Sequence, residues 1–372
     1  MSAPNLADII ALTQLKGVDS RLLMRLREKG ISASEFLSMS ASSQGEACGL
    51  LSLTPWSESD ILHARQTGEK ESAFCQRHNI KVLSPICDDY PRRLDVLDYA
   101  PPILFMLGNA DLDALHIIGV VGTRRVTPLN HKFTQDFVEE LGQLVHNPVI
   151  VSGLAYGVDA AAHTAALDNE LPTIAVLAHG LSMIYPAAHR TLAEKIVNAG
   201  GGLLTQYLSS EKPFKGKFLE RNRIIAAISD GVLVVESAIK GGAMNTAHAA
   251  SDFSRTVMAV PGRPGDAMSE GCNQLIRNQI AVLTSNARQA CDSLGWAIAA
   301  KGDKKEDPTL FREPDAELLP IYKVIQESSE PVGIDFLTVK CGLPPSRISS
   351  MLFFLEEEGF VLRMPNNRYT VS

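Results

Sequence analysis

Small residues and an arginine follow two short apolar segments of the sequence, and this chemistry suits the binding of phosphate. The apolar segments are residues 117–121 and 149–151. Glycine lets the backbone turn tightly and approach a ligand, while backbone amides and a guanidinium group are good partners for phosphate oxygens. The alternative for each segment is an ordinary tight turn between a strand and a helix. The candidate residues are Gly122, Thr123 and Arg124 after the first segment and Ser152 and Gly153 after the second.

A basic stretch with two phenylalanines is the next candidate for phosphate chemistry. Residues 211–223 hold five basic and two acidic side chains, a net charge of +3 in a chain whose formal net charge is −7. Exposed cations bind the phosphates of a single strand, and aromatic rings stack on its bases. The alternative is a solvated loop with Phe214 and Phe218 in the core. The candidate residues are Lys217, Phe218, Arg221, Asn222 and Arg223.

Two further pairs of residues are secondary candidates. Asp159 and His163 are four residues apart, so both face one side of a helix. Gly241 and Gly242 supply a tight turn into another helix. A single histidine on an apolar helix is more often a packed residue than a catalytic base, and no Ser–His–Asp or Cys–His set is visible. The sequence therefore predicts a binding protein and not an enzyme.

Glu236 follows the apolar segment 231–235, and its carboxylate has two interpretations. We favour an internal brace, in which Glu236 pairs with Arg221 or Arg223, because a buried charge needs a partner. The other interpretation is a catalytic carboxylate.

The elements that must position these residues alternate between strands and helices. Continuous apolar runs suit strands that are buried on both faces of a parallel sheet, and amphipathic segments lie between them. The alternation predicts a Rossmann-like, doubly wound α/β fold with a mainly parallel sheet. Ligands of such folds bind at the carboxyl ends of the strands, where the candidate residues lie. The predicted strands are residues 117–121, 149–151, 173–177, 203–205, 231–235, 257–260 and 281–284.

The two ends of the chain predict additional domains. The last residues predict a winged helix, whose wing is a hairpin around residues 365–367. A charged stretch with two prolines precedes it and predicts a flexible linker. The expected domains are residues 1–85 (helical, helix-hairpin-helix or SAM-like), 86–300 (Rossmann-like), 301–315 (linker) and 316–372 (winged helix).

Bulk composition is that of an ordinary globular protein. The chain is 45% hydrophobic and 21% charged, and it has no apolar run of the roughly 18 residues that a membrane-spanning helix needs. No basic segment typical of a secretory signal is present near the N-terminus. The six cysteines form no C-x-x-C pair, so we expect reduced thiols, no metal site and a cytoplasmic location.

Together these residues resemble the DNA-processing protein A family, also called DprA or Smf. The resemblance covers residues 89–290 and rests on the order and spacing of several motifs. The chain differs from the family pattern at five places, which identifies it as a divergent member. The motifs include residues 121–124 (Val-Gly-Thr-Arg), 152–159 (Ser-Gly-Leu-Ala-Tyr-Gly-Val-Asp), Phe218, 221–225 (Arg-Asn-Arg-Ile-Ile) and 260–262 (Val-Pro-Gly). The differences lie at Ala178, Leu219, Ile280 and the pairs 129–130 and 205–206.

The resemblance implies binding of single-stranded DNA without sequence preference and assistance in loading a RecA-type recombinase during DNA uptake, recombination or repair. It also implies a homodimer, no metal and no nucleotide cofactor, and it leaves a single-strand coating protein open as a further partner. The DNA-contacting positions of the family fall on Arg124, Gly153, Phe218, Arg221 and Arg223, with Lys217 as an addition.

Two other functions stay open at this point. A nucleotide-processing enzyme similar to the LOG-type phosphoribohydrolases would share the turn at Gly241 and Gly242, but residues 247–250 lack the acidic residue of those enzymes. A regulator acting through the winged helix would need a basic recognition helix, whereas this one carries Arg347 together with glutamates at 356–358. That helix suits a protein partner better than duplex DNA.

Overall fold

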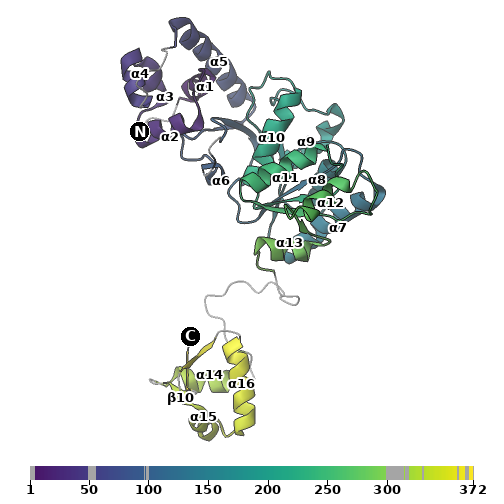
Figure 1. The fold of residues 1–372 in the computed structure, drawn as a ribbon. Coiled ribbons are helices and arrows are strands. Elements are labelled where there is room, and N and C mark those ends of the chain that lie inside the picture. Colours follow the sequence, from purple (N-terminus) through teal and green to yellow (C-terminus); the bar gives the residue numbers. More distant parts are fainter. Residues whose placement is uncertain are drawn as a thin grey trace. The chain divides into compact units, whose positions relative to one another are not determined.

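The chain forms two compact units, Met1–Ala300 and Lys301–Ser372, and each is considered by itself (Figure 1). Apart from Pro314, the predicted linker lies outside the residues that the computed structural model describes, and so does the predicted tip of the wing at residues 365–367. The described residues are 5–48, 56–95, 97, 100–298, 314, 318–328, 331–357, 360–364 and 368–371.

Five helices open the first unit and pack around a small apolar core of their own that includes Leu12, Leu23 and Phe36. The first two helices are separated by a turn in which Gly17 has a φ of 88°, a conformation that favours glycine. Among the described residues of this part, 5–48 and 56–77, the helical prediction is correct, but residues 80–83 form a strand of the main sheet. The helices are α1 (Leu6–Gln14), α2 (Ser20–Glu28), α3 (Ala33–Ser38), α4 (Ala41–Cys48) and α5 (Glu58–Arg77).

A nine-stranded sheet forms the centre of the first unit, with the strand order β1-β2-β6-β5-β4-β3-β7-β8-β9. The seven strands from β6 to β9 are parallel, whereas β1 and β2 extend the sheet in an antiparallel manner. The seven predicted strands are confirmed. The strands are β1 (Ile80–Leu83), β2 (Leu104–Gly108), β3 (Ile117–Val121), β4 (Val149–Ser152), β5 (Thr173–Val176), β6 (Gly202–Thr205), β7 (Gly231–Val234), β8 (Thr256–Ala259) and β9 (Val282–Leu283).

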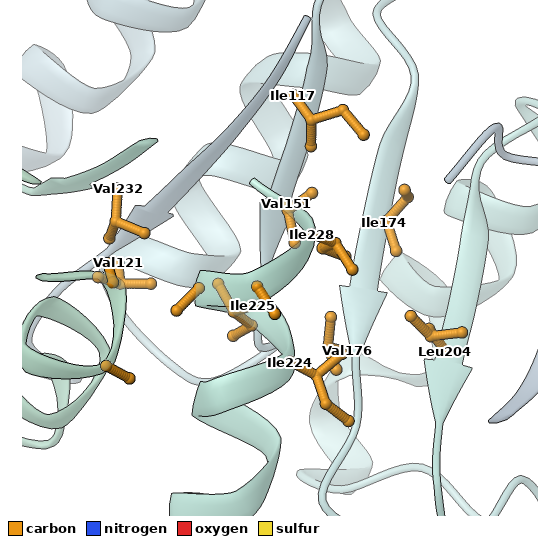
Figure 2. Packing of buried hydrophobic residues seen from close by; sticks show 14 of the residues in the cluster. Ile117, Val121, Val151, Ile174, Val176, Leu204, Ile224, Ile225, Ile228 and Val232 are labelled. Atoms are coloured by element: carbon orange, nitrogen blue, oxygen red, sulfur yellow. The ribbon is translucent and has the colours of Figure 1, made fainter. Parts of the chain in front are cut away.

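Helices cover both faces of the sheet, which confirms the doubly wound fold. The apolar residues of α10 lie against one face, where Ile224, Ile225 and Ile228 pack over the strands (Figure 2). Phe137 of α7 belongs to the core of the other face. The helices of this part are α6 (Arg92–Asp95), α7 (Pro128–Leu144), α8 (Val158–Asp168), a 3-10 helix (Ala187–His189), α9 (Arg190–Asn198), α10 (Lys215–Ile228), α11 (Gly242–Asp252), α12 (Glu270–Arg277) and α13 (Ala287–Leu294).

The second unit has the predicted winged-helix arrangement of three helices and a small sheet. Its core contains Ile321, Leu337 and Leu352, one from each helix. In the described part of the chain, no helix is long and apolar enough to cross a membrane. The elements are α14 (Leu319–Gln326), β10 (Val332–Gly333), α15 (Ile334–Cys341), α16 (Pro345–Glu357), β11 (Val361–Met364) and β12 (Arg368–Val371).

Candidate nucleic-acid interface

A cleft of about 240 Å³ lies at the carboxyl ends of β3 and β7. These two strands are neighbours in the sheet, and the strand order reverses between them. Such a switch point is where open α/β sheets bind their ligands, because the loops after the two strands diverge there. Most of the residues named from the sequence line this cleft. They are Gly122, Thr123, Arg124, Asp159, Phe218, Arg221, Asn222, Gly241 and Gly242.

Arg124 and Phe218 lie together at this cleft. The Arg124 side chain is exposed and makes no ion pair or hydrogen bond with the described residues. Its guanidinium carbon is 5.4 Å from the centroid of the half-buried Phe218 ring. The ring of Tyr185 meets Phe218 edge to face at 6.1 Å between centroids. An exposed cation beside an aromatic ring is a suitable surface for one phosphate and one base.

Arg221 has an internal role that its sequence context did not reveal. The side chain is only 5% exposed, and Nη1 donates hydrogen bonds to the carbonyl oxygens of Gly153 and Val176. Burial lowers the pKa of the guanidinium, while the carboxylate of Asp159 opposes that change. Arg221 therefore ties α10 to the ends of β4 and β5, and its guanidinium lies 5.8 Å from the Phe218 centroid. Direct contact of Arg221 with phosphate stays a prediction.

Ser152, Gly153 and Asp159 stabilise the loop after β4 from within. Ser152 donates to the carbonyl of Val120 at 2.7 Å, and Asp159 accepts from the backbone amide of Gly153 at 3.2 Å. A Cβ atom on Gly153 would overlap the guanidinium of Arg221, so only glycine fits there without a shift. Burial raises the pKa of the Asp159 carboxyl, partly offset by Arg221. Contact of DNA with Gly153 stays a prediction.

His163 is a packed residue, in line with the general expectation for a single histidine on an apolar helix. The Thr173 hydroxyl donates to the carbonyl of Ile150 at 2.8 Å, so the 2.7 Å bond between Thr173 and His163 has His163 Nδ1 as donor. Burial lowers the pKa of His163 to about 3, and its buried Nε2 has no partner among the described residues. His163 and Asp159 share the inner side of α8 as predicted, and both are buried.

The prediction that Glu236 pairs with Arg221 or Arg223 is wrong. Its Oε2 atom accepts three hydrogen bonds of 3.0 Å, from the backbone amide and hydroxyl of Thr127 and from the amide of Asn130. The backbone carbonyl of Glu236 also accepts from the amide of Thr123 at 2.6 Å. Glu236 therefore fixes both ends of the loop that carries Arg124. Its partners are about 110 residues away in the sequence, so spacing alone could not identify them.

The basic stretch is a helix from Lys215 onward, not a loop, and its side chains diverge. Phe218, Arg221 and Asn222 face the cleft because they are three and four residues apart. Lys217 forms an ion pair with Glu211 at 2.8 Å. Arg223 is exposed in a separate hollow, 5.1 Å from the ring of Phe253.

The opposite wall of the cleft is the start of α11, at the glycine pair predicted from the sequence. Gly241 is the N-cap residue, and a Cβ atom there would overlap the hydroxyl of Ser237. Gly242 has open space around it. The polar residues Ser237 and Asn245 also line the cleft, and they were not predicted from the sequence. Their only sequence signal was proximity to the glycine pair.

Comparison with known proteins assigns the chain to a family. Residues 81–295 match the family model of DNA recombination-mediator protein A, and residues 305–367 match that of the DprA winged helix domain. The chain belongs to the DprA family. The predicted resemblance is therefore confirmed. The chain is 35% identical to protein Smf of Synechocystis, with 79% of this chain and 81% of the relative covered. It is 32% identical to protein Smf of Escherichia coli, with 79% of each chain covered.

Solved structures of other DprA proteins share the fold. The X-ray structure of DNA processing protein A from Streptococcus pneumoniae has a TM-score of 0.64 and 29% identity, with 77% of this chain and 97% of that chain covered. A structure that describes a single-stranded DNA binding mode of the Helicobacter pylori DprA protein has a TM-score of 0.52 and 31% identity, with coverage of 58% and 95%.

Proposed function

We propose that this DprA protein binds single-stranded DNA without sequence preference in the cleft between β3 and β7. The observation that carries the proposal is the exposed, unpaired Arg124 beside the Phe218 ring at the switch point of the sheet. Arg124 neutralises a phosphate, and Phe218 offers its face to a base of any identity. The single-stranded DNA binding described for the H. pylori relative supports the same ligand class.

The contribution of Arg124 is measurable as a change in salt dependence. Binding of single-stranded and duplex oligonucleotides is followed by fluorescence anisotropy at several salt concentrations. With about three to five phosphates engaged, log K should fall with log salt with a slope of roughly −2 to −3.5. Arg124→Ala should weaken binding to every sequence alike and flatten the slope by about 0.7, whereas Phe218→Ala should cost about 1–3 kcal/mol.

Arg288→Ala is the matched control, because Arg288 is exposed on α13 and does not line the cleft. Equal binding by the wild-type chain and the Arg124→Ala variant would overturn the proposal. So would a preference for duplex over single strands. A loss that is confined to one oligonucleotide sequence would contradict phosphate contact by Arg124.

We further propose that the bound strand is delivered to a RecA-type recombinase, and that a single-strand coating protein is a further partner. The family description as a recombination mediator supports this step. The chain should accelerate recombinase assembly on coated single strands, and the Arg124→Ala variant should not. Absence of acceleration by the wild-type chain would reject the delivery step and leave strand binding untouched.

The homodimer is also part of the proposal. Strand β9 is the last strand of the sheet, and its residues Val282 and Leu283 are 51% and 47% exposed. An exposed apolar edge strand favours pairing with another chain. Sedimentation of the wild-type chain should show a dimer, and the double substitution of Val282 and Leu283 by glutamate should give a monomer. A dimer that survives the substitution would exclude this edge.

A further inference from the structure

A second hollow, of about 450 Å³, shares Arg124 with the cleft. It is formed by α7, by the start of α8 and by the loop between β3 and α7. The residues that line it include Arg124, Arg125 and His131, all exposed, and none of its described lining residues is acidic. The hollow therefore presents positive charge without a competing carboxylate in its wall, which favours a polyanion as occupant.

The aromatic side chain of Tyr156 also lines this hollow. Tyr156 is 49% exposed, although large aromatic side chains are usually buried. Its ring meets the ring of His189 edge to face at 4.8 Å between centroids, and His189 Nδ1 bonds the carbonyl of Leu154 at 2.8 Å. His189 thus packs against the Tyr156 ring, which still lines the hollow and is half exposed.

The loop between β4 and α8, which carries Tyr156, is in close backbone contact with the loop between β3 and α7, which carries Arg124. Gly157 has a φ of 79°, and a Cβ atom there would overlap the carbonyl of Thr123. The amide of Val158 donates to the same carbonyl at 3.2 Å. Only glycine permits this close approach, so the backbone fixes Tyr156 relative to Arg124 and Arg125.

Arg124 lines both the hollow and the cleft, so the two form a continuous surface across one residue. We propose that the hollow is a second subsite, which takes the next segment of the same single strand. One base stacks on Tyr156, and the adjoining phosphate lies at Arg125 and His131. The inference rests on the proposed function and extends it from one phosphate and one base to a path with a defined direction, from Phe218 over Arg124 to Tyr156.

The experiment compares a short and a long oligonucleotide, of about 4 and about 15 thymidines, because single-strand sites span about 4–16 nucleotides. Fluorescence anisotropy measures the binding of each oligonucleotide to five full-length proteins. They are the wild-type chain, Tyr156→Leu, Tyr156→Phe, Arg125→Ala and the control Arg288→Ala. Tyr156→Leu should lower the affinity for the long oligonucleotide by about 5- to 100-fold. Its affinity for the short oligonucleotide should stay within about twofold of the wild-type value. Tyr156→Phe keeps the ring and should bind as the wild-type chain does. Arg125→Ala should flatten the salt slope by about 0.7 on the long oligonucleotide only.

The outcomes separate this inference from the proposed function. If Tyr156→Leu and Arg125→Ala bind the long oligonucleotide as the wild-type chain does, the second subsite is rejected while the cleft stands. If Tyr156→Leu weakens both lengths equally, Tyr156 supports the cleft and a separate subsite is likewise rejected. If the wild-type chain binds neither length, the proposed function itself fails. Circular dichroism of each variant confirms that the fold is retained.

Discussion

At the scale of single residues, the contact between Gly153 and Arg221 sets the shape of the cleft. The guanidinium of Arg221 lies where a side chain of residue 153 would be, and it bonds carbonyl groups at the ends of two strands. Both residues were predicted from the sequence, but their contact was not, because Gly153 and Val176, the two partners of Arg221, lie 68 and 45 positions before it. Arg124 and Phe218 were identified more directly, since an arginine and an aromatic residue after a strand keep their chemistry in any exposed setting.

Gly153→Ala should destabilise the protein by displacing Arg221. The added methyl group overlaps the guanidinium, and overpacking of this kind costs about 1–3 kcal/mol. Urea denaturation followed by circular dichroism measures the loss. Gly242→Ala is the matched control, because a Cβ atom there meets nothing within 4 Å. Equal stability of Gly153→Ala and Gly242→Ala would show that Arg221 moves aside without cost.

At the scale of elements, burial decides what the sequence could predict. The six parallel strands from β3 to β8 are almost entirely buried, so their continuous apolar runs identified them. Strand β9 was predicted as well, although its two residues are exposed. Strands β1 and β2 were missed because they pair antiparallel and so lie outside the alternation of strands and helices on which the prediction rested. Strand β1 also lies at the edge of the sheet, with Lys81 exposed. Helix α10 was not predicted as a helix, because its first turns alternate lysine, glycine and phenylalanine. Its burial begins only at Arg221, where the last two turns cover the sheet.

The loop between β3 and α7 is the element on which the proposed site most depends, and Glu236 fixes it. Glu236→Ala should leave the amide of Thr127 and the side chain of Asn130 without their acceptor. A fully buried group left unpaired costs about 1–3 kcal/mol, and these two groups are half-buried, so each should cost less than that. Affinity for single-stranded DNA should fall with it, because Arg124 loses its fixed position. Denaturation and anisotropy measure the two effects.

Glu236→Gln separates this positioning role from a need for charge. The glutamine retains an accepting oxygen, so it should preserve most of the stability and of the affinity. Asn130→Ala removes only one of the three donors and should lie between the wild-type chain and Glu236→Ala. Full affinity in Glu236→Ala would show that Arg124 does not need the Glu236 contacts.

At the scale of the whole molecule, the order of the strands gathers the binding residues from distant parts of the chain. Residues after β3, β4 and β7 meet because these strands end at the same edge of the sheet. All the residues of the cleft and of the hollow belong to the first compact unit. The winged-helix unit instead exposes Val339, Phe353 and Phe354, which are 82%, 60% and 51% exposed. Phosphate contacts need cations, and these three side chains supply none.

Removal of residues 301–372 should therefore leave a folded protein that binds single-stranded DNA with an affinity within about twofold of the full chain. The salt slope should be unchanged, because no phosphate contact is lost. Thermal denaturation and anisotropy of the truncated chain test both expectations, with Arg124→Ala introduced into the truncated chain as the binding-deficient control. A large loss of affinity with a retained fold would move the main DNA contact to the winged helix. The alternative of a regulator acting through that unit would then be favoured over binding in the cleft.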